Sequence, residues 1–138
     1  MGTGARSVRA LTPDDADALL PFDPDGNIGP ALGMHTDGVG VWDGDTLIAV
    51  STWRVYGAEW ASTLISVLPQ WRRQGIATDL KKQLVMRAHA AGASHVRSTI
   101  AWGNDPMIAL NAKLGARIVW DRPVLGKPQW VEAFIDLR

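Results

Sequence analysis

Residues 65–78 read ISVLPQWRRQGIAT and decide the fold of this chain. The first residues have strand composition, a short basic segment follows, and a helical pattern begins near Ala77. Backbone N–H groups in the first turn of a helix have no partner within the helix, and the helix dipole adds partial positive charge there. The stretch therefore predicts a strand, a loop and a helix start that together cradle a diphosphate.

Two features of this loop favour a bound anion. Gly75 and the small Ala77 let the oxygens of a ligand approach the backbone, and Arg72 and Arg73 bring local positive charge. An ordinary strand-to-helix turn with two solvated arginines explains the same residues equally well when the loop is taken alone. The patterns G-x-x-x-x-G-K-[ST] and G-x-G-x-x-G do not occur, so other common phosphate-binding motifs fit the sequence less well.

The composition limits the classes of function. At 138 residues the chain fits one domain, residues 1–138, and its hydrophobic content of 46% with seven tryptophans argues against disorder. The formal net charge is zero, which gives no sign of a nucleic-acid or membrane partner. The absence of cysteine excludes a disulfide framework and a cysteine nucleophile. Without a signal-peptide pattern or a long apolar run, we expect a soluble, cytoplasmic protein.

The segments before residue 65 predict antiparallel strands. Asp43-Gly44-Asp45 separates the β-rich runs 39–42 and 46–56, which is typical of a hairpin, and Gly57-Ala58 leads into a further strand, 59–67. Upstream, residues 5–11 predict a short strand. Thr12-Pro13 then begins a helix that extends to about residue 20, and 28–36 hold one more helical turn.

The segments after the loop alternate between helix and strand. Apolar residues at helical spacing predict a helix that begins at Ala77 and ends at Gly92. A strand at 95–102, a helix from 105 to 114, and strands at 117–120 and 130–137 follow, with 121–128 as a loop. The fold class is therefore α/β (α+β): a mixed sheet with helices on its faces.

Two motifs in this order resemble the acetyl-CoA signatures of the GCN5-related N-acetyltransferase (GNAT) superfamily. Residues 72–77, RRQGIA after VLP, resemble the first signature. The second is N-x-x-M-x-x-x-N-x-x-L-G on the helix after residue 102, here Asn104, Met107, Asn111, Leu114 and Gly115. The resemblance covers most of the chain from Val39 onward and extends to the first strand and helix. It implies a mostly antiparallel sheet with helices on both faces and with strands four and five splayed apart.

The resemblance also implies where coenzyme A binds. In this superfamily the pantetheine arm lies between the splayed strands and pairs with strand four, which by position implicates Ile65, Ser66 and Val67. The pyrophosphate rests on the loop and helix start, here Arg72, Arg73, Gln74, Gly75, Ile76, Ala77 and Thr78. Asn104 matches a position whose side chain often contacts the CoA arm. It is also suited to capping the helix, and the two roles are compatible.

The implied activity is transfer of an acetyl group from acetyl-CoA to a primary amine of a small molecule or protein. Many superfamily members protonate the departing thiolate with a tyrosine where this chain has Asn111, which is not an acid. Asn111 can still hydrogen-bond and is a catalytic candidate, together with Tyr56, the only tyrosine, and Glu59, acting as a base through water. Packing in the sheet and a solvated strand end explain Tyr56 and Glu59 as well. The three histidines lack the spacing of metal ligands, so we expect no metal.

Several alternatives stay open from the sequence. The donor is another acyl thioester, either an acyl-CoA or a carrier protein, or the chain binds CoA with little catalysis. The short segment between the first strand and the hairpin implies an open acceptor cleft, a large acceptor, or completion by a second copy in a homodimer. Trp53 and Trp60 on neighbouring strands line an acceptor pocket, pack in the core or belong to an interface.

Overall fold

The computed structural model describes residues 6–120 and 130–138. The first half of the chain forms the expected meander of β1 (Arg6–Ala10), β2 (Asp37–Asp43), β3 (Thr46–Tyr56) and β4 (Glu59–Val67). Each of these strands pairs antiparallel with the next. The β2–β3 hairpin turns at Gly44, whose φ of 59° belongs to the left-handed region that glycine adopts most readily. The hairpin predicted at Asp43-Gly44-Asp45 is confirmed.

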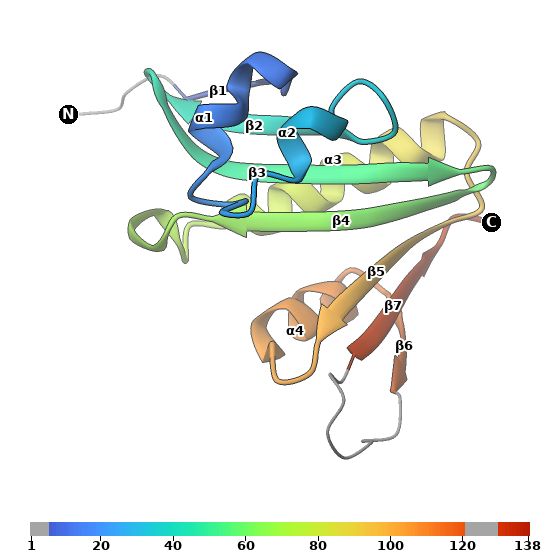
Figure 1. The fold of residues 1–138 in the computed structure, drawn as a ribbon. Coiled ribbons are helices and arrows are strands. Elements are labelled where there is room, and N and C mark those ends of the chain that lie inside the picture. Colours follow the sequence, from blue (N-terminus) through green and yellow to red (C-terminus); the bar gives the residue numbers. More distant parts are fainter. Residues whose placement is uncertain (1–5, 121–129) are drawn as a thin grey trace.

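The helices lie on both faces of the sheet, as predicted. The helix expected from residue 13 is split into a 3-10 turn, Pro13–Asp15, and α1 (Ala16–Leu19), and the later helical turn is α2 (Ile28–Ala31). Figure 1 shows α1 and α2 on one face of the sheet and α3 (Ile76–Ala90) on the other. A 3-10 turn, Pro69–Trp71, connects β4 with the loop before α3.

The chain after α3 adds three strands and one helix. β5 (His95–Ala101) pairs parallel with β4, α4 (Asp105–Lys113) follows, and β6 (Arg117–Trp120) and β7 (Trp130–Asp136) complete the sheet. The strand order is β1-β2-β3-β4-β5-β7-β6, and every pair except β4–β5 is antiparallel. The loop predicted at 121–128 lies outside the described residues.

The splay between β4 and β5 coincides with a bulge in β4. The parallel pairing of β4 with β5 runs from Glu59 only to Ser62. On the other edge of β4, Trp53 pairs with Ser62 and Thr52 with Leu64, so Thr63 is an extra residue without a pair. A bulge bends its strand and increases the local twist. Figure 1 shows β5, together with β7, diverging from β4.

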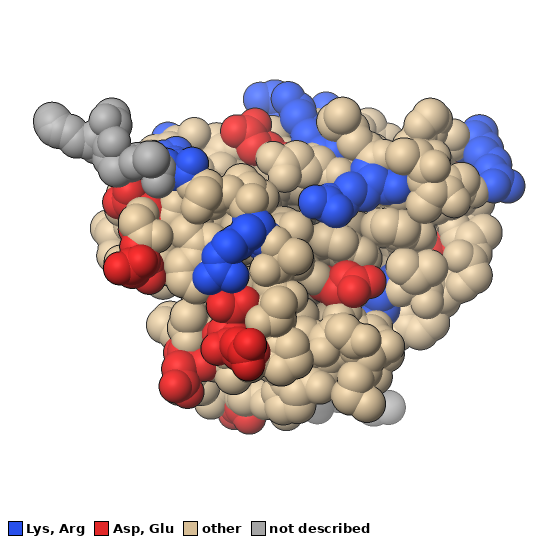
Figure 2. Space-filling model, turned by 90° about the horizontal axis from the view of Figure 1, so that it is seen from above, with Lys and Arg blue, Asp and Glu red and all other residues tan. Residues whose placement is uncertain are grey.

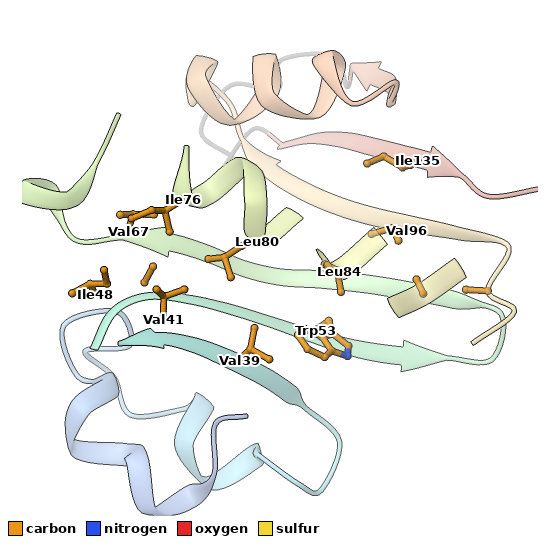
Figure 3. Packing of buried hydrophobic residues seen from close by; sticks show 13 residues of the cluster. Val39, Val41, Ile48, Trp53, Val67, Ile76, Leu80, Leu84, Val96 and Ile135 are labelled. Atoms are coloured by element: carbon orange, nitrogen blue, oxygen red, sulfur yellow. The ribbon is translucent and has the colours of Figure 1, made fainter. Parts of the chain in front are cut away.

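The main core lies between α3 and the sheet (Figure 3). Leu80 and Leu84 of α3 are almost fully buried and pack towards apolar side chains of β3 and β4. Trp53 belongs to this core, and its ring is stacked on Trp60 with the ring centroids 6.0 Å apart. Trp53 therefore packs in the core with Trp60 partly buried against it, and a role for the pair in an acceptor pocket stays a prediction. A second cluster lies under α1 and α2 and includes Leu19, Leu32 and Trp42.

The surface carries both signs of charge. Figure 2 shows Lys and Arg side chains mostly in the upper part of the view and Asp and Glu side chains mostly at its left and lower part, and neither sign covers the face. No helix in the described ranges has both the length and the apolar character needed to cross a membrane. A site for an anion must therefore be a local feature of the molecule, as the zero net charge predicts.

Candidate active site

A groove with a volume of about 590 Å³ lies where the first signature meets the second. Its walls come from the end of β4 (Ile65, Ser66 and Val67), from the loop and start of α3 (Trp71 to Arg73 and Gly75 to Thr78), and from Asn104, Pro106, Met107 and Leu110. The first two segments are nearly contiguous, and Asn104 comes about 26 residues after Thr78 in the sequence. The fold brings them together because β4 leads directly into α3 and α4 follows the diverging strand β5.

The backbone at the start of α3 exposes unpaired N–H groups to the groove. Gly75 is the N-cap, and the residues that follow it, Ile76, Ala77 and Thr78, form the first turn and line the groove. A Cβ on Gly75 would meet no atom within 4 Å, whereas its φ of 78° is unfavourable for other residues. The backbone conformation therefore favours glycine here, and the predicted need for space around a ligand stays a prediction.

The two arginines of the loop play different parts. Arg72 folds back, and its Nε donates a hydrogen bond to the Val67 carbonyl oxygen at 3.0 Å, which ties the loop to the end of β4. Arg73 is exposed, lines the groove and has a φ of 64°, which is uncommon for a non-glycine residue. Gln74 does not line the groove, because its side-chain oxygen accepts a hydrogen bond from Arg6 on β1.

The edge of β4 that faces the groove has no strand partner in the described part of the chain. Ile65, Ser66 and Val67 pair with β3 on one side, but the pairing with β5 ends at Ser62. Beyond this residue, the Val67 carbonyl oxygen accepts a hydrogen bond from Arg72, and the other backbone N–H and C=O groups that point away from β3 can bind an amide-containing ligand. The arrangement joins an open strand edge to a helix N-terminus in one groove.

Asn104 has the position expected for both of its predicted roles. It is the N-cap of α4, and its Oδ1 accepts a hydrogen bond from the Met107 backbone N–H at 3.4 Å. It also lines the groove, together with Met107 from the next turn. The capping role is confirmed, and the exposed side chain borders the space that a ligand would occupy.

Glu59 does not lie at the groove. It is the first residue of β4, six residues before Ile65, which places it about 20 Å away along the strand. Its Oε1 accepts hydrogen bonds from Arg97 Nε at 2.9 Å and from His95 Nε2 at 3.1 Å. The hydrogen bond from Arg97 holds the pKa of Glu59 below its ordinary value, which makes the carboxylate a weaker base. Glu59, the base predicted from the sequence, therefore lies away from the groove.

Tyr56 and Asn111 are not brought to the groove either. Tyr56 pairs with Glu59 at the same distant end of the sheet, and 53% of its surface is exposed. Asn111 is fully buried, and its Nδ2 donates to the Met107 carbonyl oxygen at 2.9 Å. Its Oδ1 is buried without a partner. The signature helix therefore turns Asn111 into the protein, and neither residue lines the groove.

Sequence reasoning missed Lys81, which lies at the point where β4 and β5 separate. A smaller cavity of about 140 Å³ is lined by residues 62–65 of β4, 98–101 of β5, Asn104, Met107 and Lys81. Lys81 is 1% exposed, and its Nζ donates a hydrogen bond to Ser98 Oγ. A signal existed, because positions 81, 84 and 88 share one face of a helix and the other two are apolar.

Comparisons with known proteins agree with this architecture. The family model described as Acetyltransferase (GNAT) family matches residues 12–116. A crystal structure of Arabidopsis thaliana NAA60 in complex with acetyl-CoA superposes with a TM-score of 0.80 and 15% identity over 96% of this chain and 99% of that one. The crystal structure of the ribosomal-protein-S18-alanine N-acetyltransferase from Escherichia coli gives a TM-score of 0.77 and 16% identity over 94% of this chain and 90% of that one.

A third structure, an acetyltransferase from Bacillus subtilis in complex with CoA, gives a TM-score of 0.74 and 20% identity over 96% of this chain and 98% of that one. A comparison of the sequence with curated proteins gave no match. At identities this low, the solved structures establish only the fold. The family model covers more than half of the chain and therefore establishes the family. The chain is an acyltransferase that belongs to the GNAT family of acetyltransferases.

Proposed function

We propose that this enzyme transfers an acetyl group from acetyl-CoA to a primary amine by direct attack of the amine on the thioester. One observation carries the proposal: the unpaired edge of β4 and the N-terminus of α3 lie in the same groove. A strand edge suits the amides of a pantetheine arm, and a helix N-terminus suits a pyrophosphate. Acetyl-CoA contains both groups in this order.

Within the groove, the proposed contacts follow from the chemistry of each wall. Backbone groups of Ile65 to Val67 would pair with the pantetheine amides, and the N–H groups of Ile76 to Thr78 would bind the pyrophosphate. Arg73 would add a side-chain charge, since it is exposed beside the helix start. Asn104 would contact the arm from the opposite wall.

The amine acceptor is proposed on two grounds. Thioester aminolysis needs proximity and orientation more than a strong base, so a groove that fixes the donor supplies a large part of the catalysis. The structures that resemble this chain include an N-acetyltransferase for an alanine residue and a complex of NAA60 with a bisubstrate analogue. An amine-bearing small molecule and a protein N-terminus or side chain both fit this chemistry.

Calorimetry with acetyl-CoA tests the donor site. We expect binding by the wild type, and at least about tenfold weaker binding by Arg73→Glu and Gly75→Glu, because each puts negative charge into the anion site. Lys82→Glu is the matched control, since Lys82 is an exposed residue of α3 outside the groove. No binding by the wild type, or equal weakening by the control, would refute the proposed donor site.

Mass spectrometry of an amine library incubated with enzyme and acetyl-CoA tests the reaction. We expect a mass increase of one acetyl group on an amine acceptor, dependent on the enzyme. A competition between acetyl-CoA and an acyl-carrier protein tests the donor class in the same assay. Preference for the carrier protein would replace acetyl-CoA as the proposed donor, and tight CoA binding without any transfer would contradict the proposed reaction.

A further inference from the structure

Lys81 is the one lysine side chain of the described residues that is almost completely removed from solvent. It projects from α3 into the sheet, between Leu80 and Leu84, at a helix position where the neighbouring turns present apolar residues to the core. Burial of an amine without a counter-charge is costly, so such groups are rare in proteins. The structure therefore raises the question of what this amine does.

The residues around Lys81 accept only part of the hydrogen bonds that its amine can donate. Its Nζ donates to Ser98 Oγ, and no carboxylate in the described ranges forms an ion pair with it. An ammonium group has three N–H donors, so two remain. The only cause that acts on its pKa is burial, which lowers the pKa from 10.5 to about 8. The amine is thus poised to gain or lose a proton near neutral pH.

The position of the amine links it to the groove. Ala77 and Thr78 line the groove one helical turn before Lys81, so the three residues lie along the same side of α3. The small cavity that Lys81 lines shares Ile65, Asn104 and Met107 with the groove. Ser98, the hydrogen-bond partner of Lys81, belongs to the last pair between β4 and β5. The amine therefore lies at the closed end of the space between the splayed strands.

We propose that Lys81 is the catalytic acid that protonates the CoA thiolate as the thioester bond breaks. This inference rests on the proposed function, because it requires that an acyl-CoA bound along β4 directs its thioester towards the closed end of the splay. Lys81 would then supply the proton that the family often takes from the tyrosine replaced here by Asn111.

The proposed step balances as follows. The neutral acceptor amine attacks the carbonyl carbon, the C–N bond forms, and the C–S bond breaks with its electron pair on sulfur. The Lys81 ammonium gives a proton to this sulfur, and CoA leaves as the thiol. The acceptor nitrogen releases its extra proton to water, and Lys81 regains a proton from water after the thiol departs. The products are the acetylated amine and CoA, with Lys81 unchanged.

The acidity of the two groups suits a direct transfer. A cysteine thiol has a pKa of about 8.5 and a simple alkyl thiol is less acidic, so an ammonium group with a pKa of about 8 can protonate the thiolate without an uphill step. The other residues around the small cavity, from β4, β5 and α4, carry no charge and no group that titrates near neutral pH. The adjoining groove adds the side chains of Arg72 and Arg73 to these surroundings.

A titration of bound CoA tests the proposal without knowledge of the acceptor. The ultraviolet absorbance of the thiolate is followed against pH for CoA bound to the wild type, Lys81→Met and Lys82→Met. We expect the thiol pKa to be higher in Lys81→Met by about one unit, because the variant lacks the neighbouring positive charge. Lys82→Met replaces an exposed lysine on the same helix and should match the wild type.

Turnover with two donors separates proton donation from a purely structural role. With an acceptor from the amine screen, Lys81→Met should lower kcat with acetyl-CoA by about 100-fold. The loss should nearly disappear with an acetyl thioester of an aromatic thiol, whose thiolate leaves without a proton. Lys82→Met keeps the buried amine and should retain the activity with both donors.

Three results would overturn the role of Lys81: an equal thiol pKa in the wild type and Lys81→Met, an equal loss of turnover with both donors, or acetylation of Lys81 itself in the intact mass. The proposed function fails in a different way. In that case the wild type does not bind CoA, and the titration yields only the pKa of free CoA for every variant. A wild type that binds CoA while the variants behave alike would refute the inference about Lys81 alone.

Discussion

Ser62 of β4 and Ser98 of β5 form the last pair of the only parallel ladder in the described sheet. The next residue of β4, Thr63, is the unpaired residue of the bulge, and its Oγ1 lies 2.7 Å from Thr52 Oγ1 on β3. The bulge bends β4 where the hydrogen bonding to β5 ends. Beyond the bulge, the edge of β4 is open towards the groove. Lys81 donates to Ser98 at the closed end of the space between β4 and β5.

Burial of Lys81 should reduce the stability of the fold in a pH-dependent way. The pKa is about 8 in the folded protein and 10.5 in the reference state, so the unfolded chain binds more protons between these values. Wild-type stability should therefore rise as the pH increases from 8 to 10.5. Below pH 8 the buried amine is charged, and its burial lowers the free energy of unfolding by about 3 kcal/mol. Lys81→Met should be more stable there by about this amount, as measured by urea unfolding at several pH values.

The control for this prediction is Lys82→Met, which should follow the wild type at every pH because Lys82 is exposed. The difference between Lys81→Met and the wild type should shrink as the pH rises towards 10.5. A difference that stays constant with pH would show that burial does not lower the pKa of Lys81.

Substitutions of the two loop arginines should affect different properties: one the stability of the fold and the other the affinity for CoA. Arg72→Ala removes the hydrogen bond to the Val67 carbonyl and should lower the free energy of unfolding by about 1 kcal/mol. Arg73→Gly removes a charge but relieves a left-handed backbone conformation, so stability should stay within about 0.5 kcal/mol of the wild type. CoA affinity should fall in Arg73→Gly. Urea unfolding and calorimetry check the pair, and a large loss of stability in Arg73→Gly would contradict it.

Glu59 should contribute to stability through its hydrogen bonds with Arg97 and His95. Its pKa is lowered mainly by the hydrogen bond from Arg97, so the contribution is present above the unfolded pKa of 4.5 and is lost as the pH falls through the folded pKa. Glu59→Gln should destabilise the protein by up to about 1 kcal/mol at pH 7. Thermal unfolding should show this difference vanish in acid, and CoA affinity should not change. A difference that persists in acid would exclude the ionised carboxylate as its source.

Tyrosine at position 111 should not restore an acid to the groove. Asn111 has no exposed surface, so Asn111→Tyr adds an aromatic ring to a packed interior and should cost about 1–3 kcal/mol of stability. Asn111→Leu is the size-matched comparison. It removes the buried Oδ1, which has no partner, at the expense of the hydrogen bond to Met107, so it should cost less. Urea unfolding of both variants distinguishes them. Equal stability of Asn111→Tyr and wild type would show that this side of α4 is open.

The order and type of the elements could be predicted because their signals are local. β3 and β4 have the predicted bounds, Thr46–Tyr56 and Glu59–Val67, since the turn residues that flank them have strong conformational preferences. The groove walls at Ile65 to Val67 and Gly75 to Thr78 also follow from one contiguous stretch and its resemblance to a family signature. The exception is Gln74, which a contact with Arg6 on β1 turns away from the groove.

The catalytic candidates were less predictable, because their positions depend on contacts between segments that are distant in the sequence. Alternation along β4 places Glu59 on the same face as Ala61, but only the register of β4 with β5 shows that Glu59 pairs with Arg97 and His95. Asn111 has the motif position of an acid, but the packing of α4 against β7 and β6 determines that it faces inward.

The sequence by itself therefore determined the strand, loop and helix of residues 65–78. The signals in this stretch are a helix start, a glycine and two arginines, and each of them depends only on the backbone of neighbouring residues. Only the tertiary structure decided which ionisable group stands at the end of the groove. Lys81 became a buried amine because α3 packs across the point where β4 and β5 separate. Burial, and with it the lowered pKa, arises from surrounding residues that the chain supplies from distant segments.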